Sequence, residues 1–76
     1  MLRNLNVSGP IAHIRFRGLS RDVELATLGL TSAAPESEIR AALARLLEVE
    51  DAVINEYMLE RHASGNVTLR PHAVFG

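Results

Sequence analysis

The arginines are the residues of this sequence best suited to binding an anionic group. The 76 residues include eight arginines and no lysine, with Arg15 and Arg17 at alternate positions of one segment and Arg70 in another. A guanidinium group presents its N–H donors in a planar fork that matches a carboxylate or a phosphate. If the two segments are neighbouring strands, these three arginines predict an outward basic stripe that binds an acidic surface of a protein partner, or a phosphate. The alternative is a solvated sheet face with cross-strand ion pairs to Glu24 or Glu60.

Three histidines, His13, His62 and His72, are the candidate metal ligands, since imidazole binds metals readily. They show no ligand spacing such as two histidines four residues apart, and no acidic residue is obviously placed to complete a site. We therefore expect no metal and interpret the histidines as solvent-facing strand residues. If the last strand lies beside the first, His13 and His72 share a face.

An acidic cluster follows the best helical segment of the chain and consists of Glu48, Glu50 and Asp51. Its spacing is not that of a calcium-binding loop. We interpret the cluster as an exposed helix end, and a docking point for a basic partner is the alternative.

The chain carries none of the sequence signatures of an enzyme. It has no nucleophile elbow, no phosphate-binding loop and no G-x-G-x-x-G pattern. It has no cysteine either, which excludes disulfides, thiol catalysis and cysteine-based zinc sites. A chain of this length leaves little room for a deep pocket beside a hydrophobic core. We expect no catalytic residue, no cofactor and no enzymatic activity.

Composition also restricts the partners and the compartment. Eight arginines oppose nine acidic residues and give a formal net charge of −1, whereas nucleic-acid binders usually carry a concentrated basic surface. The longest apolar stretches are a few residues, far below the ~20 that span a bilayer. Residues 1–12 lack the pattern of a signal peptide. We expect a cytoplasmic protein that binds neither nucleic acid nor membrane.

The first regular element is predicted over residues 11–17. Ser8-Gly9-Pro10 separates a short N-terminal arm, residues 1–10, from a single α+β domain over residues 11–76. Apolar and polar residues then alternate, which is typical of a half-buried antiparallel strand. The apolar face holds Ala12, Ile14 and Phe16, and the polar face holds His13, Arg15 and Arg17. We expect a turn over residues 18–22 and a return strand from Val23 to about Leu28.

An amphipathic helix is predicted after residues 31–35. Apolar residues recur at the spacing of one helix face over three turns; they are Ile39, Ala42, Leu43, Leu46 and Leu47. Pro35 suits the first turn, with Ser32 or Ala34 as the N-cap. Glu36 and Arg40 are four residues apart and should form an ion pair worth about 0.3 kcal/mol.

Residues 50–62 fit two interpretations. Val53, Ile54, Tyr57 and Met58 could continue a helical stripe with Asp51 as its cap. Residues 57–62 also alternate as a strand does, and the turn residues 63–66 lead into a β-branched segment. We favour a hairpin of residues 56–62 with 67–75. The order is then strand-strand-helix-strand-strand, over a core of Ile14, Phe16, Val23, Leu25, Ile39, Leu43, Leu46, Leu47, Leu59, Val67 and Leu69.

This order of elements, with the closing segment 65–76 and its glycine end, resembles the ubiquitin-like β-grasp fold. Within that fold the chain resembles the small sulfur carriers of molybdopterin and thiamine synthesis. The resemblance implies one helix packed on a mixed sheet. It also implies an activating enzyme that uses ATP to adenylate the carboxylate of Gly76, which then becomes a thiocarboxylate. Phe75 stands where these carriers have a second glycine, and its ring would obstruct a narrow active-site channel or pack against the domain.

Two functions from different classes follow from these observations. The first is a small non-catalytic ubiquitin-like module that binds a protein partner as an accessory to a larger complex, through an open sheet edge. The second is a sulfur carrier or protein modifier that acts through Gly76. A homodimer formed by edge pairing is a third arrangement.

Overall fold

A four-stranded mixed sheet organises the chain, and the computed structural model describes its residues 9–72. The elements in chain order are β1 (Ile11–Phe16), β2 (Leu19–Glu24), the 3-10 helix η1 (Leu25–Leu28), α1 (Glu36–Leu47), α2 (Asp51–Asn55), β3 (Met58–Arg61) and β4 (Val67–Arg70). The predicted α+β class is confirmed. The predicted arm over residues 1–10 lies almost wholly outside the described residues, as do Phe75 and Gly76.

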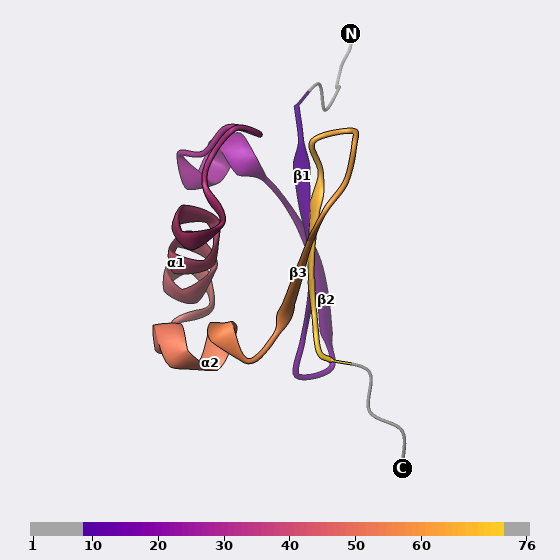
Figure 1. Cartoon of the computed structure of the whole chain (residues 1–76). Helices are drawn as coiled ribbons and strands as arrows, with labels where there is room; N and C mark the ends of the chain where they lie inside the picture. Colours follow the sequence, from indigo (N-terminus) through magenta and orange to yellow (C-terminus); the bar gives the residue numbers. More distant parts are fainter. Residues whose placement is uncertain (1–8, 73–76) are drawn as a thin grey trace, which may run out of the picture.

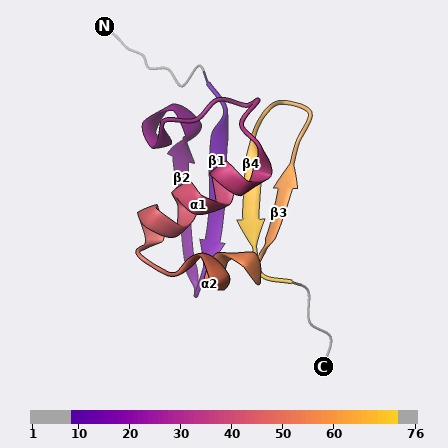
Figure 2. The same cartoon turned by 60° about the vertical axis from the view of Figure 1, so that its left-hand side comes forward.

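The strands lie in the order β2-β1-β4-β3 (Figure 2). β1 pairs antiparallel with β2 and parallel with β4, and β3 pairs antiparallel with β4. The last strand therefore lies beside the first, in the centre of the sheet. All the helical elements cover one face of the sheet, and the opposite face is uncovered within the described residues (Figure 1).

The hydrophobic core lies between the sheet and α1. The alternation predicted for β1 is confirmed, since its apolar side chains are buried together with those of Val67 and Leu69 from β4. Ile39 and Leu43 of α1 are fully buried against this face. Four predicted core residues, Val23, Leu46, Leu47 and Leu59, are only partly buried and pack around the core.

Ile54 is a core residue that the sequence interpretation missed. It belongs to α2, the helical interpretation that was not favoured for this segment, and its side chain has no exposed surface. The alanines Ala34 and Ala44 are also buried and were missed.

The second strand of the first hairpin begins four residues earlier than the sequence indicated. Arg17 and Gly18 form the turn with φ of 51° and 81°, and β2 begins at Leu19 rather than at Val23. Positive φ at both central residues is the pattern of a type I′ turn, whose twist matches that of the flanking strands. The expected return strand over 23–28 is therefore wrong beyond Glu24, because residues 25–28 form η1.

The predicted helix is confirmed as α1, with one correction at its start. Pro35 itself occupies the N-cap position, and neither Ser32 nor Ala34 does. The carbonyl of Pro35 accepts hydrogen bonds from the N–H groups of Glu38 and Ile39. The expected ion pair is present, with 2.7 Å between Nε of Arg40 and Oε2 of Glu36.

The two interpretations of residues 50–62 each hold for a part of the segment. Residues 51–55 form α2, which follows Glu50 as N-cap rather than Asp51. Residues 58–61 form β3, so the favoured hairpin with β4 is confirmed, but β4 ends at Arg70. Nη1 of Arg40 links the parts, because it donates to the carbonyl oxygens of Ile54 and Tyr57 at 2.9 and 3.0 Å.

No helix within residues 9–72 has the length and apolar character that crossing a lipid bilayer requires.

Replacing Leu43 by alanine should lower the free energy of unfolding by about 2–5 kcal/mol, since it leaves a cavity in the core. Leu43 is fully buried, whereas Leu19 is 50% exposed and provides a matched leucine control. Chemical denaturation measures both variants. An unchanged midpoint for Leu43→Ala would contradict the burial of this face of α1.

Replacing Gly18 by alanine should lower the free energy of unfolding by about 1–2 kcal/mol, because a Cβ is unfavourable in the left-handed region. Gly18 has φ of 81°, while Gly9 lacks such a conformation and has open space for a Cβ. Gly9→Ala is therefore the control in thermal unfolding. Equal melting temperatures for the two variants would refute the assigned turn.

Candidate functional site

An open hollow of about 420 Å³ lies where the β1–β2 turn meets the end of β4. Its lining consists of Arg15, Phe16, Arg17, Gly18, Leu19, Ser20, Arg70, Pro71 and His72. This part of the sheet is at the bottom of Figure 2. All three arginines that the sequence singled out contribute to the lining, and no acidic residue within the described part of the chain does.

Arg15 and Arg70 are brought together by the parallel pairing of β1 with β4. Ile14 is opposite Leu69 in the register, and each arginine is the next residue along its strand. Because successive side chains of a strand point to opposite faces, both arginines lie on the uncovered face. Arg15 is exposed and has no ion pair within residues 9–72. Among these described residues, no acidic side chain neutralises its guanidinium.

Arg70 forms contacts with neighbouring residues of its own chain. Its Nη2 lies 2.8 Å from Oε2 of Glu60 on β3, and its Nη1 donates to the carbonyl of Pro71 at 3.3 Å. The hydrogen bond from Arg70 lowers the pKa of Glu60, helped by the positive charges of Arg70 and His62, while desolvation opposes the shift. The same hydrogen bond raises the pKa of Arg70. The alternative interpretation, a cross-strand ion pair, therefore holds for Arg70 with Glu60, and Glu24 forms none within the described residues.

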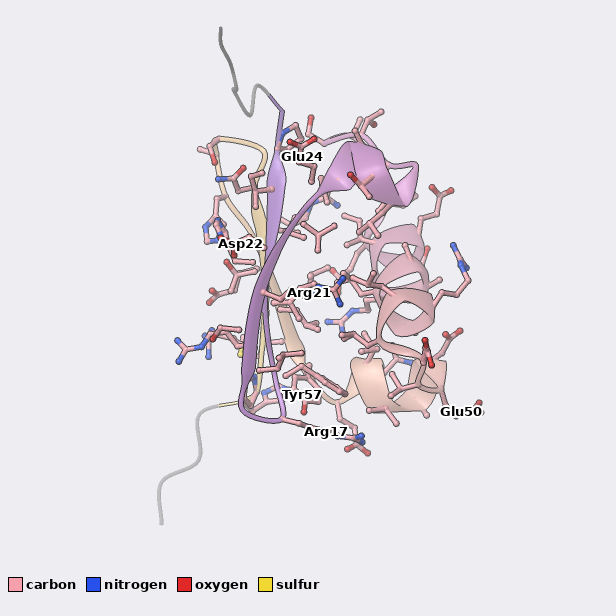
Figure 3. The ribbon with its side chains drawn as sticks, turned by 180° about the vertical axis from the view of Figure 1, so that it is seen from behind. Arg17, Arg21, Asp22, Glu24, Glu50 and Tyr57 are labelled. Atoms are coloured by element: carbon pink, nitrogen blue, oxygen red, sulfur yellow. The ribbon has the colours of Figure 1, made fainter. Side chains whose placement is uncertain are left out.

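Arg17 does not belong to the uncovered face, which corrects its predicted place in the stripe. It is a turn residue, and its guanidinium carbon lies 4.8 Å from the centre of the Phe16 ring. Phe16 is buried on the helix side and packs on Tyr57 with 5.1 Å between the ring centres. Figure 3 shows Arg17 beside Tyr57 at this end of the molecule. Only Arg15 and Arg70 form the outward basic pair.

Two of the three histidines, His13 and His62, contact polar side chains of the sheet. Nδ1 of His13 lies 2.9 Å from Oδ1 of Asp22, and Nε2 of His62 lies 2.9 Å from the Thr68 hydroxyl. An acidic partner for His13 was not expected, because the sequence interpretation placed Asp22 in the turn. Within residues 9–72 no three histidine, cysteine or acidic side chains gather as a metal site would require.

Within residues 9–72, β2 is an open edge of the sheet next to the hollow. Its first four residues are exposed, and Leu19 is 50% exposed although it faces the helix side opposite Phe16. Arg21 also lies on the helix side, and Asp22 points to the uncovered side (Figure 3). The sequence interpretation missed this edge because it began the strand at Val23.

The backbone of β2 has hydrogen-bonding groups directed away from the sheet. Phe16 and Leu19 flank the two-residue turn and form the hydrogen-bonded pair that closes it. Antiparallel pairs alternate between hydrogen-bonded and non-hydrogen-bonded positions. By this alternation, Ser20 and Asp22 direct their N–H and C=O groups outward.

The opposite edge, β3, is less accessible. It has four residues, three of which are partly buried. Arg61 at its end donates to the carbonyl of Ser32 at 2.9 Å, which connects this strand to the loop before α1. Glu60 is held by Arg70. β2 is therefore the more open of the two edges.

A second hollow of about 370 Å³ lies between α1 and α2, and its charged lining consists of Glu36, Arg40 and Asp51. Arg40 is already bonded to Glu36 and to two backbone carbonyls. Glu48, which ends α1 with φ of 60°, and Glu50 are exposed nearby. The acidic cluster is thus exposed at the end of α1, as expected, and it also leads into α2, which was not expected.

Comparison with family models, with the curated proteins and with the solved structures gives no match to this chain.

The pKa of Glu60 provides a test of the Arg70 contact. Because the folded-state pKa lies below the ordinary value of 4.5, the pair stabilises the fold above the unfolded-state pKa. That contribution is lost as the pH falls through the folded-state pKa. Carboxyl NMR should give a Glu60 midpoint below 4.5 in the original chain and a higher one in Arg70→Gln. Arg45→Gln is the control, and an unmoved midpoint in Arg70→Gln would disprove the contact.

Proposed function

We propose that this chain is a small non-catalytic protein-interaction module with a ubiquitin-like β-grasp fold, accessory to a larger complex. The strand order supports the fold assignment: a parallel pair in the centre, an antiparallel strand on each side, and the helices on one face. The observation that carries the function is the open edge of β2, where exposed side chains and outward backbone groups occur together.

Strand addition is the binding mode that this edge favours. An extended segment of a partner can pair with the outward N–H and C=O groups of Ser20 and Asp22. The half-exposed side chain of Leu19 offers apolar contact on the helix side of the same strand. An uncovered edge of this kind is a common site of association between chains. The hollow adjoins the edge, since Leu19 and Ser20 belong to both.

The edge itself is tested by Ser20→Pro. Proline removes the outward N–H of Ser20 without removing a donor to β1, and edge strands tolerate it. A partner captured by cross-linking is purified and titrated calorimetrically against the full chain. Ser20→Pro should weaken binding about tenfold, because one carbonyl of the partner loses its donor.

Ser20→Ala is the matched control, since it removes the hydroxyl but keeps the N–H, and it should bind as the original chain does. Equal affinity of Ser20→Pro and Ser20→Ala would contradict strand addition at β2. A doubled mass in light scattering that Ser20→Pro abolishes would make the partner a second copy of this chain. An adduct formed on Gly76 by an activating enzyme would instead favour the carrier function.

A further inference from the structure

We infer that the segment bound by β2 is acidic at one defined position, and that its carboxylate enters the hollow to pair with Arg15. The inference rests on the proposed interaction function and adds the chemistry of the partner. Three observations carry it: the guanidinium of Arg15, which has no ion pair within residues 9–72, the short side chain of Ser20 beside it on the edge, and the charge of the hollow.

The register connects the edge with Arg15. Ser20 of β2 is directly opposite Arg15 of β1, and both side chains lie on the uncovered face. Neighbouring strands are about 4.8 Å apart, so a partner residue opposite Ser20 would lie about 10 Å from the backbone of Arg15. A glutamate and an arginine together span such a distance. The serine side chain is short enough to leave the space above it free.

The next outward position of the edge does not offer the same chemistry. Two residues along β2 is Asp22, whose carboxylate is 2.9 Å from Nδ1 of His13. A second carboxylate there would meet a negative charge, and like charges on neighbouring strands are destabilising. The preference for an acid is therefore specific to the position opposite Ser20, which fixes the register of the partner.

The charge of the hollow favours a carboxylate over a phosphate. Arg70 is largely neutralised by Glu60 at 2.8 Å, and the guanidinium of Arg17 lies on the helix side over Phe16. Arg15 is left as the one uncompensated charge on this face of the hollow, among the described residues. A single positive charge matches a carboxylate, whereas a phosphate monoester carries about −1.5 to −2 at neutral pH. The volume of about 420 Å³ accommodates the side chain that carries this carboxylate.

A random twelve-residue peptide library, displayed on phage and panned on the immobilised full chain, tests the inference. Peptides selected by the original chain should share an acidic residue at one position of an alternating motif. Arg15→Glu should select lysine or arginine at that position, because the charge of the hollow is reversed. Arg45→Glu makes the same charge change at an exposed site on α1 and should select the original acidic motif.

A selected peptide then gives the affinities. Changing its acidic residue to the amide should weaken binding about tenfold to the original chain and leave binding to Arg15→Gln nearly unchanged, since a charge-assisted hydrogen bond is lost only in the first case. Inorganic phosphate should displace the peptide only weakly. Selection of acid-free peptides, an Arg15-independent affinity, or displacement by low phosphate would each overturn the inference.

The same peptide separates this inference from the proposed function. Peptides that lose affinity for Ser20→Pro but show no acidic preference leave strand addition intact and refute the carboxylate contact. Peptides that require Arg15 but bind Ser20→Pro normally support the carboxylate contact and refute strand addition at the edge.

Discussion

The parallel pairing of β1 with β4 is the constraint on which the rest of this structure depends. It joins segments that are far apart in sequence, as does the hydrogen bond from the Ile11 N–H to the Asn66 side chain, 55 residues later. Parallel neighbours need a long crossover connection. Here that connection contains α1 and α2, which cover one face of the sheet and bury Leu43 and Ile54 against it. The uncovered face and its charged side chains are a direct consequence.

The candidate surface depends on two features at one end of the sheet, the first turn and the pairing of β1 with β4. The two-residue turn at Arg17 and Gly18 starts β2 early, which exposes Leu19 and Ser20 along an edge. The central pair places Arg15 beside Arg70, and Glu60 neutralises only the second of these. The edge provides backbone groups, and the hollow provides one charge that no residue within 9–72 compensates. The proposed partner, an extended segment with one carboxylate, uses both.

Much of the fold could be predicted from local patterns. The alternation over β1 and the apolar stripe of α1 depend on residues close in sequence, and both are confirmed. The hairpin of β3 and β4 was predicted from its turn residues. The first turn was misplaced because Gly18, Ser20 and Asp22 are all common turn residues, and only pairing with β1 places the turn at Arg17 and Gly18. The short helix α2 is stabilised by Ile54 in the core and by Arg40, which donates to the carbonyls of Ile54 and Tyr57. The helical stripe through Ile54 was one possible interpretation, whereas the contacts of Arg40 join distant residues and have no local signal.

The sequence by itself determined that the basic side chains are arginines and that no thiol chemistry is possible. Its patterns also indicated one amphipathic helix and strands with one buried face. It also indicated Arg15, Arg17 and Arg70 as binding candidates. Only the tertiary structure decided which of these arginines is paired and on which face of the sheet each one lies, because strand pairing and turn geometry set both. Within residues 9–72, Arg70 is paired with Glu60, Arg17 stacks on Phe16 on the helix side, and Arg15 lies beside the β2 edge without an ion pair. Whether an arginine is neutralised depends on the acidic and aromatic side chains near it in space, and these can come from residues distant in sequence.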